Sequence, residues 1–236
     1  MRLVRLVANL GYGSQRDVRE MIRWGRVTAP DGTPYGPDDK AEHDQVLVDG
    51  EPLDPPPGVV LLMNKPTGYT CSTSDPGRIV YELLPERFMH RKPVIAPVGR
   101  LDRETSGLLL LTDDGQLLHR ITSPKHHVPK TYEVTLDRPL TGTEGDVFGR
   151  GGLILKGEKT PLLPAVLEPT GDKTARLTIT EGRYHQVRRM FAAVGNHVVA
   201  LHRAAIGGLT LAELPEGEWR PLASGELDRI FAGRGA

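Results

Sequence analysis

Apolar residues near the start of the chain recur at helical spacing. Within residues 3–10 they occupy positions i, i+3, i+4 and i+7, which predicts a short amphipathic helix that Gly11 ends. Ser14 is a suitable N-cap for a second helix, whose apolar residues also share one face and which ends at Gly25. Alternating residues at 46–48, after a Pro-Asp-Gly turn, predict short strands. This part of the chain therefore predicts two helices followed by short strands.

Beyond residue 58 the apolar positions predict a larger sheet. Unbroken apolar runs at 59–63 and 108–111 are typical of buried strands, and residues 130–136 and 175–179 predict two more. Helices are expected at 79–84, after the turn at 113–115, and at 184–194, whereas the glycine-rich run at 149–152 predicts a turn. Strands and helices mix without a regular alternation. The predicted fold class is therefore α+β, with a mixed, mostly antiparallel sheet flanked by helices.

Three consecutive prolines divide these two regions. Proline lacks a backbone donor and fixes φ, so neither a helix nor a central strand can pass through residues 54–58. We therefore predict a small domain at residues 1–53, a linker at 54–58 and a larger domain at 59–236.

The composition is that of an ordinary folded protein without a strong overall charge. The 236 residues include 30 Lys and Arg and 30 Asp and Glu, so the formal net charge is zero and a uniformly basic nucleic-acid coat is excluded. Cys71 stands alone, which excludes an internal disulfide and a CxxC metal site and fits a reducing cytosol. No apolar run approaches the ~20 residues of a membrane helix. We expect a soluble, cytoplasmic protein that does not contact a membrane.

Arginine is concentrated locally despite the neutral total. Residues 1–27 carry six arginines against two acidic residues, which indicates either a solvated helix face or a surface for RNA. Two helices, short strands and this arginine content resemble the αL RNA-binding motif of the fourth small-subunit ribosomal protein, although Gln15 stands where that motif usually has arginine. The resemblance implies that the second helix faces RNA phosphates through Arg16, Arg19 and Arg23.

A loop at 99–107 carries a carboxylate between two arginines. Positive charge from Arg100 and Arg103 favours the ionised form of Asp102, which is the state that a nucleophilic or charge-stabilising carboxylate needs. The alternative is an ordinary turn with a local ion pair, since perturbed carboxylates are often structural. The spacing alone leaves both interpretations open.

Two further segments carry positive charge. In the helix predicted at 184–194, His185, Arg188 and Arg189 lie opposite the apolar face, either solvated or able to pair with a carboxylate and with phosphates. Residues 115–132 contain no acidic residue, and Tyr132 at their end is either a core aromatic or a ring that stacks on a base. The histidines of this stretch lack a metal-binding motif, so no metal site is expected.

Three stretches resemble a known family when they are taken together. They are GRLDRETSGLLLLTDDG, SPKHHVPKTYEVTL and EGRYHQVRRMFAAVGNHVVALHR. They are similar to the signature motifs of the ribosomal pseudouridine synthases, most closely those of the small-subunit branch. The resemblance implies that Asp102 attacks the target uridine, that Tyr132 stacks on the flipped uracil, and that Arg188 pairs with the aspartate. The residues expected to contact the RNA here are Arg100, which would help to hold the target nucleotide out of its stack, Lys130, Arg183, His185 and Arg189.

The same resemblance implies a reaction and a partner. The reaction is isomerisation of one uridine of 16S ribosomal RNA, at uridine-516 of the conventional numbering, to pseudouridine. Isomerisation is redox-neutral and needs no group donor, so no cofactor is expected. The expected partner is 16S rRNA or a small-subunit assembly particle, bound by a monomer without an obligate protein partner. Two alternatives remain: a synthase acting on 23S rRNA, and a non-catalytic RNA-binding factor that aids ribosome assembly.

Overall fold

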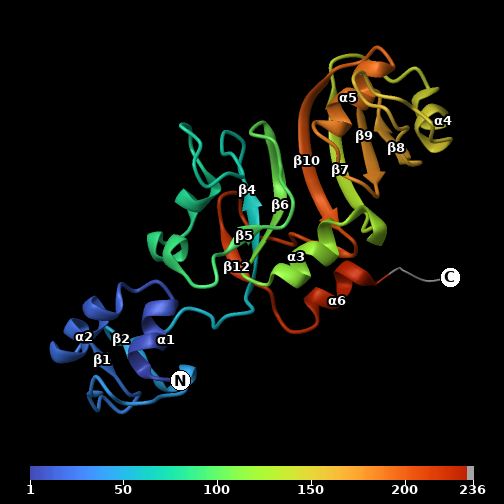
Figure 1. Cartoon of the computed structure of the whole chain (residues 1–236). Helices are drawn as coiled ribbons and strands as arrows, with labels where there is room; N and C mark the ends of the chain where they lie inside the picture. Colours follow the sequence, from blue (N-terminus) through green and yellow to red (C-terminus); the bar gives the residue numbers. More distant parts are fainter. Residues whose placement is uncertain (233–236) are drawn as a thin grey trace.

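The N-terminal part of the computed structural model, which describes residues 1–232, has a small core of its own (Figure 1). Ser14 caps the second helix, since the Asp17 N–H donates to Ser14 Oγ and the Ser14 N–H donates to the Asp17 carboxylate. The predicted helices and short strands are confirmed. The elements are α1 (Leu3–Asn9), α2 (Gln15–Arg23), the 3-10 helix η1 (His43–Gln45) and an antiparallel sheet of β1 (Val27–Thr28), β2 (Leu47–Val48) and β3 (Glu51–Pro52).

A nine-stranded sheet dominates the rest of the molecule. Its order is β12-β4-β6-β10-β7-β9-β8, with β5 beside β6 and β11 beside β10. Within the described residues β6 and β10 are parallel and the other neighbours are antiparallel, which confirms the predicted mixed, mostly antiparallel sheet and the α+β class. The strands are β4 (Val60–Lys65), β5 (Ala96–Pro97), β6 (Thr105–Thr112), β7 (Lys130–Leu136), β8 (Val166–Gly171), β9 (Thr174–Ile179), β10 (Val198–Ile206), β11 (Leu209–Thr210) and β12 (Trp219–Pro221).

The helices of this part are short. The segment predicted as a helix at 79–84 forms a 3-10 turn, because Pro85 cannot continue an α-helix. Within residues 1–232 no helix has the length and apolar character that crossing a membrane requires. The helices are α3 (Gly115–Thr122), α4 (Glu144–Gly149), α5 (Gln186–Ala193), α6 (Glu226–Phe231), and the 3-10 helices η2 (Val80–Leu83), η3 (Glu86–His90) and η4 (Pro124–His126).

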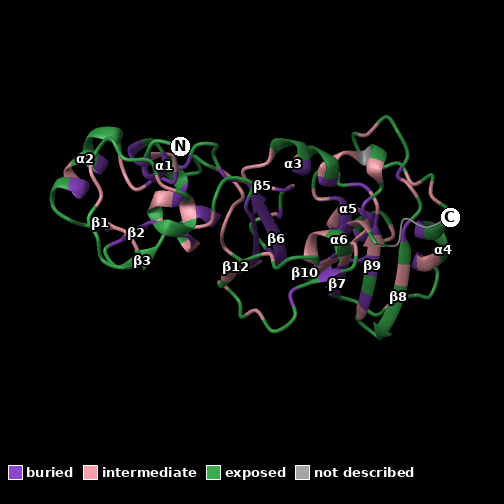
Figure 2. Cartoon of the chain, turned by 90° about the horizontal axis from the view of Figure 1, so that it is seen from below, coloured by how far each residue is buried: buried purple, intermediate pink, exposed green. Residues whose placement is uncertain are grey.

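The central strand β6 is buried on both faces (Figure 2). Leu109 and Leu111 point into one apolar core, and Leu108 and Leu110 point into a second core on the opposite face. Successive side chains of a strand alternate between faces, so burial on both sides produces an uninterrupted apolar run. This explains the run predicted as a buried strand from its sequence.

The contact between β6 and β10 joins the half of the sheet that contains β4 to the half that contains β7, β9 and β8 (Figure 1). The two strands share three register pairs, the last of which places Gly107 opposite Arg203. A Cβ on Gly107 would lie 2.4 Å from the Arg203 carbonyl oxygen, and its φ is +104°. Only glycine meets both conditions, so Gly107 allows the two halves to approach.

The predicted linker at residues 54–58 is held by the larger part of the chain. The Arg87 guanidinium pairs with the Asp54 carboxylate, and Arg91 donates a hydrogen bond of 2.7 Å to the Pro55 carbonyl oxygen. The division into domains at 1–53 and 59–236 remains a prediction, and residues 233–236 of the second lie outside the described range.

Candidate active site

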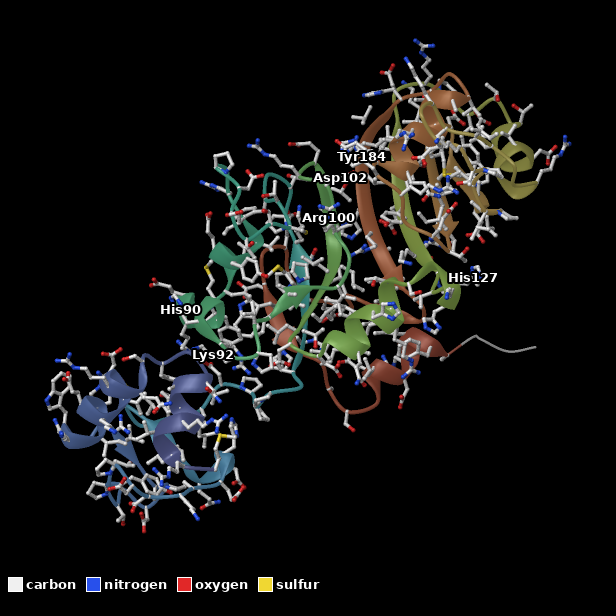
Figure 3. The ribbon with its side chains drawn as sticks, in the orientation of Figure 1. His90, Lys92, Arg100, Asp102, His127 and Tyr184 are labelled. Atoms are coloured by element: carbon white, nitrogen blue, oxygen red, sulfur yellow. The ribbon has the colours of Figure 1, made fainter. Side chains whose placement is uncertain are left out.

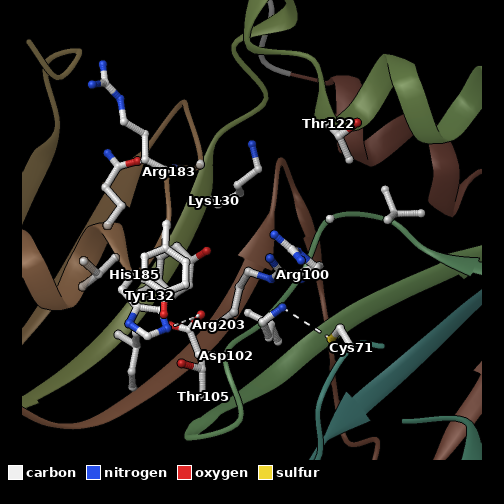
Figure 4. Close-up of a pocket in the computed structure, with 18 of the residues that line it drawn as sticks. Cys71, Arg100, Asp102, Thr105, Thr122, Lys130, Tyr132, Arg183, His185 and Arg203 are labelled. Atoms are coloured by element: carbon white, nitrogen blue, oxygen red, sulfur yellow. Dashed lines mark hydrogen bonds and ion pairs between the residues drawn. The ribbon is translucent and has the colours of Figure 1, made fainter. Parts of the chain in front are cut away.

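A cavity of about 690 Å³ lies beside the β6–β10 junction, and segments that are far apart in the sequence line it (Figure 4). They include residues 70–75, the loop 98–103, part of β7, residues 182–187 and part of β10. Its lining holds more cationic side chains (Arg100, Arg103, Lys130, Arg183 and Arg203) than acidic ones (Asp75 and Asp102). On a chain with no net charge, this local excess of positive charge favours a phosphate-bearing ligand.

The loop that carries Asp102 is organised by a buried lysine that the sequence analysis did not single out. Lys65 at the end of β4 is inaccessible to solvent, and its Nζ donates to the carbonyl oxygens of Pro66 at 2.9 Å, Asp102 at 3.3 Å and Thr105 at 2.8 Å. Burial lowers the pKa of Lys65. In the sequence Lys65 shows only as the end of an apolar strand, so no local signal marks its partners.

The same loop is held by a thiol. The Leu101 N–H donates to Cys71 Sγ at 3.4 Å, and both residues line the cavity (Figure 4). Burial raises the pKa of the Cys71 thiol, so the neutral form is favoured. Cys71 therefore acts here as a hydrogen-bond acceptor for the loop.

Asp102 is half-buried and its side chain faces His185. The distance from Asp102 Oδ1 to His185 Nε2 is 3.4 Å. The sequence placed His185 opposite the apolar face of a helix starting at Tyr184, either solvated or able to pair with a carboxylate, and the structure shows the second alternative. The helix itself begins at Gln186, and His185 is its N-cap with a left-handed φ of +48°, which helical periodicity could not reveal.

Arg188 does not make the predicted pair with Asp102. Its guanidinium donates to the carbonyl oxygens of Val198 and Glu104, both at 2.9 Å. One hydrogen bond comes from each terminal nitrogen of the guanidinium. Together the two bonds join α5 to β10 and to the loop that carries the aspartate. Arg188 thus contacts the backbone two residues beyond Asp102, and it is not among the cavity-lining residues.

Tyr132 and Lys130, which are two residues apart in β7, both line the cavity. Tyr132 is buried, and Lys130 Nζ donates to the Val128 carbonyl oxygen at 2.9 Å. Burial, together with the nearby Arg203 charge, lowers the pKa of Lys130 to about 8. An ammonium group with this pKa loses its charge just above neutral pH.

Arg203 of β10 is a cavity residue that the sequence analysis missed. It is 2% exposed, and its Nε donates to the Leu108 carbonyl oxygen at 2.7 Å. One terminal nitrogen of the guanidinium has no hydrogen-bond partner within the described residues. Its sequence signals were its place among the apolar residues of a strand and at the end of the third family-like stretch.

Arg183 and Arg189 are engaged by protein groups. Arg183 pairs with Glu181 at 3.0 Å and donates to the carbonyl oxygens of Thr160 and Pro161. Arg189 pairs with Glu158 at 3.0 Å and donates to the Lys156 and Tyr184 carbonyl oxygens. These contacts fasten the 181–189 segment to the loop at 156–161. Contact of either arginine with RNA remains a prediction.

The remaining predicted RNA contacts lie in two places. Arg100 is exposed at the cavity, near Asp102 (Figure 3). Arg16, Arg19 and Arg23 are exposed on α2, in the N-terminal part and away from the strands that line the cavity (Figure 1). Most of the predicted site residues therefore either line one cavity or lie on a separate basic helix face, whereas Arg188 and Arg189 of α5 do neither. Among residues 1–232 no group of three His, Cys, Asp or Glu side chains is arranged to hold a metal ion.

Comparisons with known proteins agree with this geometry. The model of the RNA pseudouridylate synthase family matches residues 59–193. The ribosomal small subunit pseudouridine synthase A of Escherichia coli (strain K12) is 48% identical over 98% of this chain and 100% of its own. An RNA pseudouridine synthase of Bacillus subtilis (strain 168) is 43% identical over 96% of this chain and 97% of its own. The crystal structure of a pseudouridylate synthase, 40% identical, covers 98% of this chain and 99% of its own with a TM-score of 0.68.

The family match covers the loop of Asp102, the strand of Tyr132 and the start of α5, which are the segments that meet at the cavity. The relatives extend the similarity over the N-terminal part as well. On these grounds the chain belongs to the RNA pseudouridylate synthase family.

Proposed function

We propose that this protein converts one uridine of 16S ribosomal RNA to pseudouridine, and that the target is uridine-516 of the conventional 16S numbering. The observation that carries the proposal is a carboxylate, Asp102, placed with Tyr132 in a positively charged cavity. Full-length similarity to ribosomal small-subunit synthases supports the choice of RNA. In the reaction the N1–C1′ bond breaks and a C5–C1′ bond forms, while C5 loses a proton and N1 gains one. No atom or electron is added, so the reaction needs no cofactor.

Asp102 is proposed as the nucleophile. Asp102 lines the cavity beside Arg100 and Arg103, and Lys65 holds its loop through backbone carbonyl groups. Tyr132 is proposed to stack on the extruded uracil. Extrusion of a base costs a few kcal/mol, and least where the base is already unpaired, so a looped or unfolded RNA is the favoured substrate.

Arg188 is proposed to act through the loop rather than by direct pairing with the nucleophile. Its hydrogen bond to the Glu104 carbonyl oxygen fixes the turn that begins at Asp102, where the Thr105 N–H donates to the Asp102 carbonyl oxygen. Loss of Arg188 should therefore lower the rate of catalysis, because the carboxylate loses its fixed position.

The N-terminal residues 1–53 are proposed as an RNA-binding domain joined by the linker 54–58. The support is the exposed arginine face of α2 on a separate core. Arg16, Arg19 and Arg23 are free to approach phosphates, since the ion pair from Arg16 to Glu20 is exposed and 3.7 Å long. We propose that the protein binds 16S rRNA or a small-subunit assembly particle as a monomer in the cytoplasm.

Tritium release from uridine labelled at carbon 5 tests the proposal, with 16S and 23S rRNA as substrates. We expect release from 16S rRNA alone, and a loss of at least ~1,000-fold with Asp102→Asn. RNA affinity of that variant should stay nearly unchanged, because the substitution keeps the shape of the side chain.

Release from 23S rRNA alone would support the proposed reaction but show that the substrate is 23S rRNA. Full turnover by Asp102→Asn would show that Asp102 is not the nucleophile. If neither RNA released tritium, naked or in assembly particles, while both bound, the protein would be a non-catalytic assembly factor.

A further inference from the structure

Tyr184 is an aromatic residue at the cavity for which the function described so far has no use. It is 71% exposed, more than Trp24, Ile154 or Val199, although it lines the same cavity as Asp102 (Figure 3). Its ring stacks on the ring of His185, with centroids 3.9 Å apart and an interplanar angle of 17°. One face of the tyrosine ring is thus covered by the histidine, and the side chain as a whole remains open to solvent.

The turn that carries these two rings is rigidly built. The Arg183 N–H donates to Gln186 Oε1 at 2.9 Å, and Gln186 Nε2 donates to Glu181 Oε1 at 3.2 Å. Arg189 donates to the Tyr184 carbonyl oxygen at 3.0 Å. These bonds hold the backbone on both sides of His185, whose left-handed conformation is unfavourable for a residue with a side chain. Strain of this kind persists only where the surroundings fix it, and it is concentrated at functional sites.

The stack is connected to the reacting group. The edge of the His185 ring contacts the Asp102 carboxylate through Nε2 at 3.4 Å, and its face stacks on the tyrosine, so one imidazole contacts both groups. A flat group placed on the outer face of Tyr184 would continue the stack by one layer. The cationic cavity lining beside it attracts phosphates, and a nucleobase joined to such a phosphate is a flat group of the right kind.

We propose that Tyr184 is a stacking platform for an unpaired base next to the target uridine, which rests on the proposed function. Stacking on an aromatic ring tolerates every base, because every base has a π face. The platform therefore selects the structure of the RNA, a target with an unpaired neighbour, rather than the identity of that neighbour. Arg189 and Gln186 are positioning residues for it, since they act through the turn.

Binding and turnover with altered RNA test this role. The substrate is a synthetic 16S fragment around the target uridine, and in two further RNAs the base on its 5′ or 3′ side is removed to leave an abasic sugar. Dissociation constants are measured in the Asp102→Asn background, and KM and kcat in the active protein. Tyr184→Phe keeps the ring, Tyr184→Ala removes it, and Ile154→Ala is the control, since Ile154 is exposed and does not line the cavity.

On the intact fragment we expect Tyr184→Ala to raise Kd and KM by about 5- to 150-fold, with kcat nearly unchanged. Tyr184→Phe and Ile154→Ala should stay within about twofold of the parent. On one of the two abasic RNAs the parent should bind as weakly as Tyr184→Ala, so that the difference between them disappears.

Two results would overturn the proposal. The first is a fall in kcat at unchanged KM with Tyr184→Ala, which would assign the ring to support of His185. The second is an equal loss on intact and abasic RNAs. Both leave the proposed function standing, because the parent still makes pseudouridine. If the parent releases no tritium from the intact fragment or from whole 16S rRNA, the proposed function fails and this inference fails with it.

Discussion

The arginines of α2 and those around α5 are the same residue type in opposite states. Arg19 and Arg23 project from α2 into solvent, and no ion pair or side-chain hydrogen bond is found for them among the described residues. Arg183 and Arg189 are instead surrounded by carboxylate and carbonyl acceptors. An arginine without partners is available to phosphates, whereas an engaged arginine stabilises the fold. The difference shows that counting charges in a sequence does not reveal where RNA affinity resides.

This contrast assigns two tasks to two regions. We propose that the N-terminal helix face attracts RNA phosphates, an attraction that is independent of RNA sequence and sensitive to salt. The segment at 181–189 supplies geometry, because its arginines fix the turn that carries Tyr184 and His185. Substitutions in the first region should alter binding, and those in the second should alter stability and catalysis.

Among the arginine substitutions, the largest effect is expected from Arg183→Ala. The substitution removes the ion pair with Glu181, which keeps only hydrogen bonds from neutral groups, and it removes the bonds to Thr160 and Pro161. We expect the free energy of unfolding to fall by about 3 kcal/mol, measured by urea denaturation, and turnover to fall at least tenfold. Arg183→Lys keeps the charge without the planar fork and should recover only part of the loss. Unchanged stability with weakened RNA binding would show that Arg183 binds RNA, as proposed for the α2 arginines, and does not stabilise the fold.

A smaller effect, confined to binding, is expected from replacing Arg16, Arg19 and Arg23 together by alanine. Each lost phosphate contact lowers the slope of log K against log salt by about 0.7 to 0.9, so the slope should fall by up to about 2 to 3. The melting temperature should stay nearly constant, since these side chains are exposed. Affinity measured between low and physiological salt gives the slope. If it were unchanged, α2 would have no role in RNA binding.

The sequence predicted much of the fold because its signals are local. The run at Leu108–Leu111, the Ser14 cap and the alternation at 175–179 each identify an element from neighbouring residues, and the structure confirms them. The loop of Asp102 and the strand of Tyr132 were also predicted to carry chemistry, and they meet at one cavity.

What the sequence could not predict depends on contacts between distant segments. Lys65 reaches the carbonyl of Thr105, and Arg188 reaches that of Glu104, through contacts that no periodicity encodes. The orientation of His185 depends on one positive φ. The family resemblance supplied roles for Asp102, Tyr132 and Arg188, whereas the side-chain partners of Arg188 came from the structure.

For Lys130 we predict that activity and stability change in opposite directions as the pH rises. Its pKa of about 8 in the folded protein lies below the ordinary value of 10.5. Turnover at low substrate concentration should fall about fivefold as pH rises from 8 to 9, because the cavity loses a positive charge. Stability should change in the opposite direction. The unfolded chain binds more protons between pH 8 and 10.5, so the contribution of Lys130 to stability rises over that interval.

The matched variant for this prediction is Lys130→Met. It should be less active than the parent at pH 7 and should show a flatter pH profile between 7 and 9. It should also be more stable at pH 7, because it removes a buried ammonium. A parent-like pH profile in Lys130→Met would mean that another group titrates.

The smallest effect is expected at Arg26, which is an exception within the N-terminal part. Its Nε and one terminal nitrogen donate to the two oxygens of Asp49 at 2.7 and 2.6 Å, and both side chains are half-exposed. The contrast therefore follows the partners of each arginine and not its region. Arg26→Gln should cost stability by about 0.5 kcal/mol and leave the salt dependence of RNA binding unchanged.

The pH dependence of this pair has a defined sign. The hydrogen bond from Arg26 holds the pKa of Asp49 below its usual value of 3.8. The stability that the pair contributes is thus present above pH ~4 and is lost as pH falls through the lowered pKa. Urea denaturation of the parent and of Arg26→Gln should differ at pH 7 and converge in acid. A lower salt slope in Arg26→Gln at unchanged stability would show that even a paired arginine can contribute to RNA binding. The presence of a protein partner would then not distinguish the arginines that stabilise the fold from those that bind RNA.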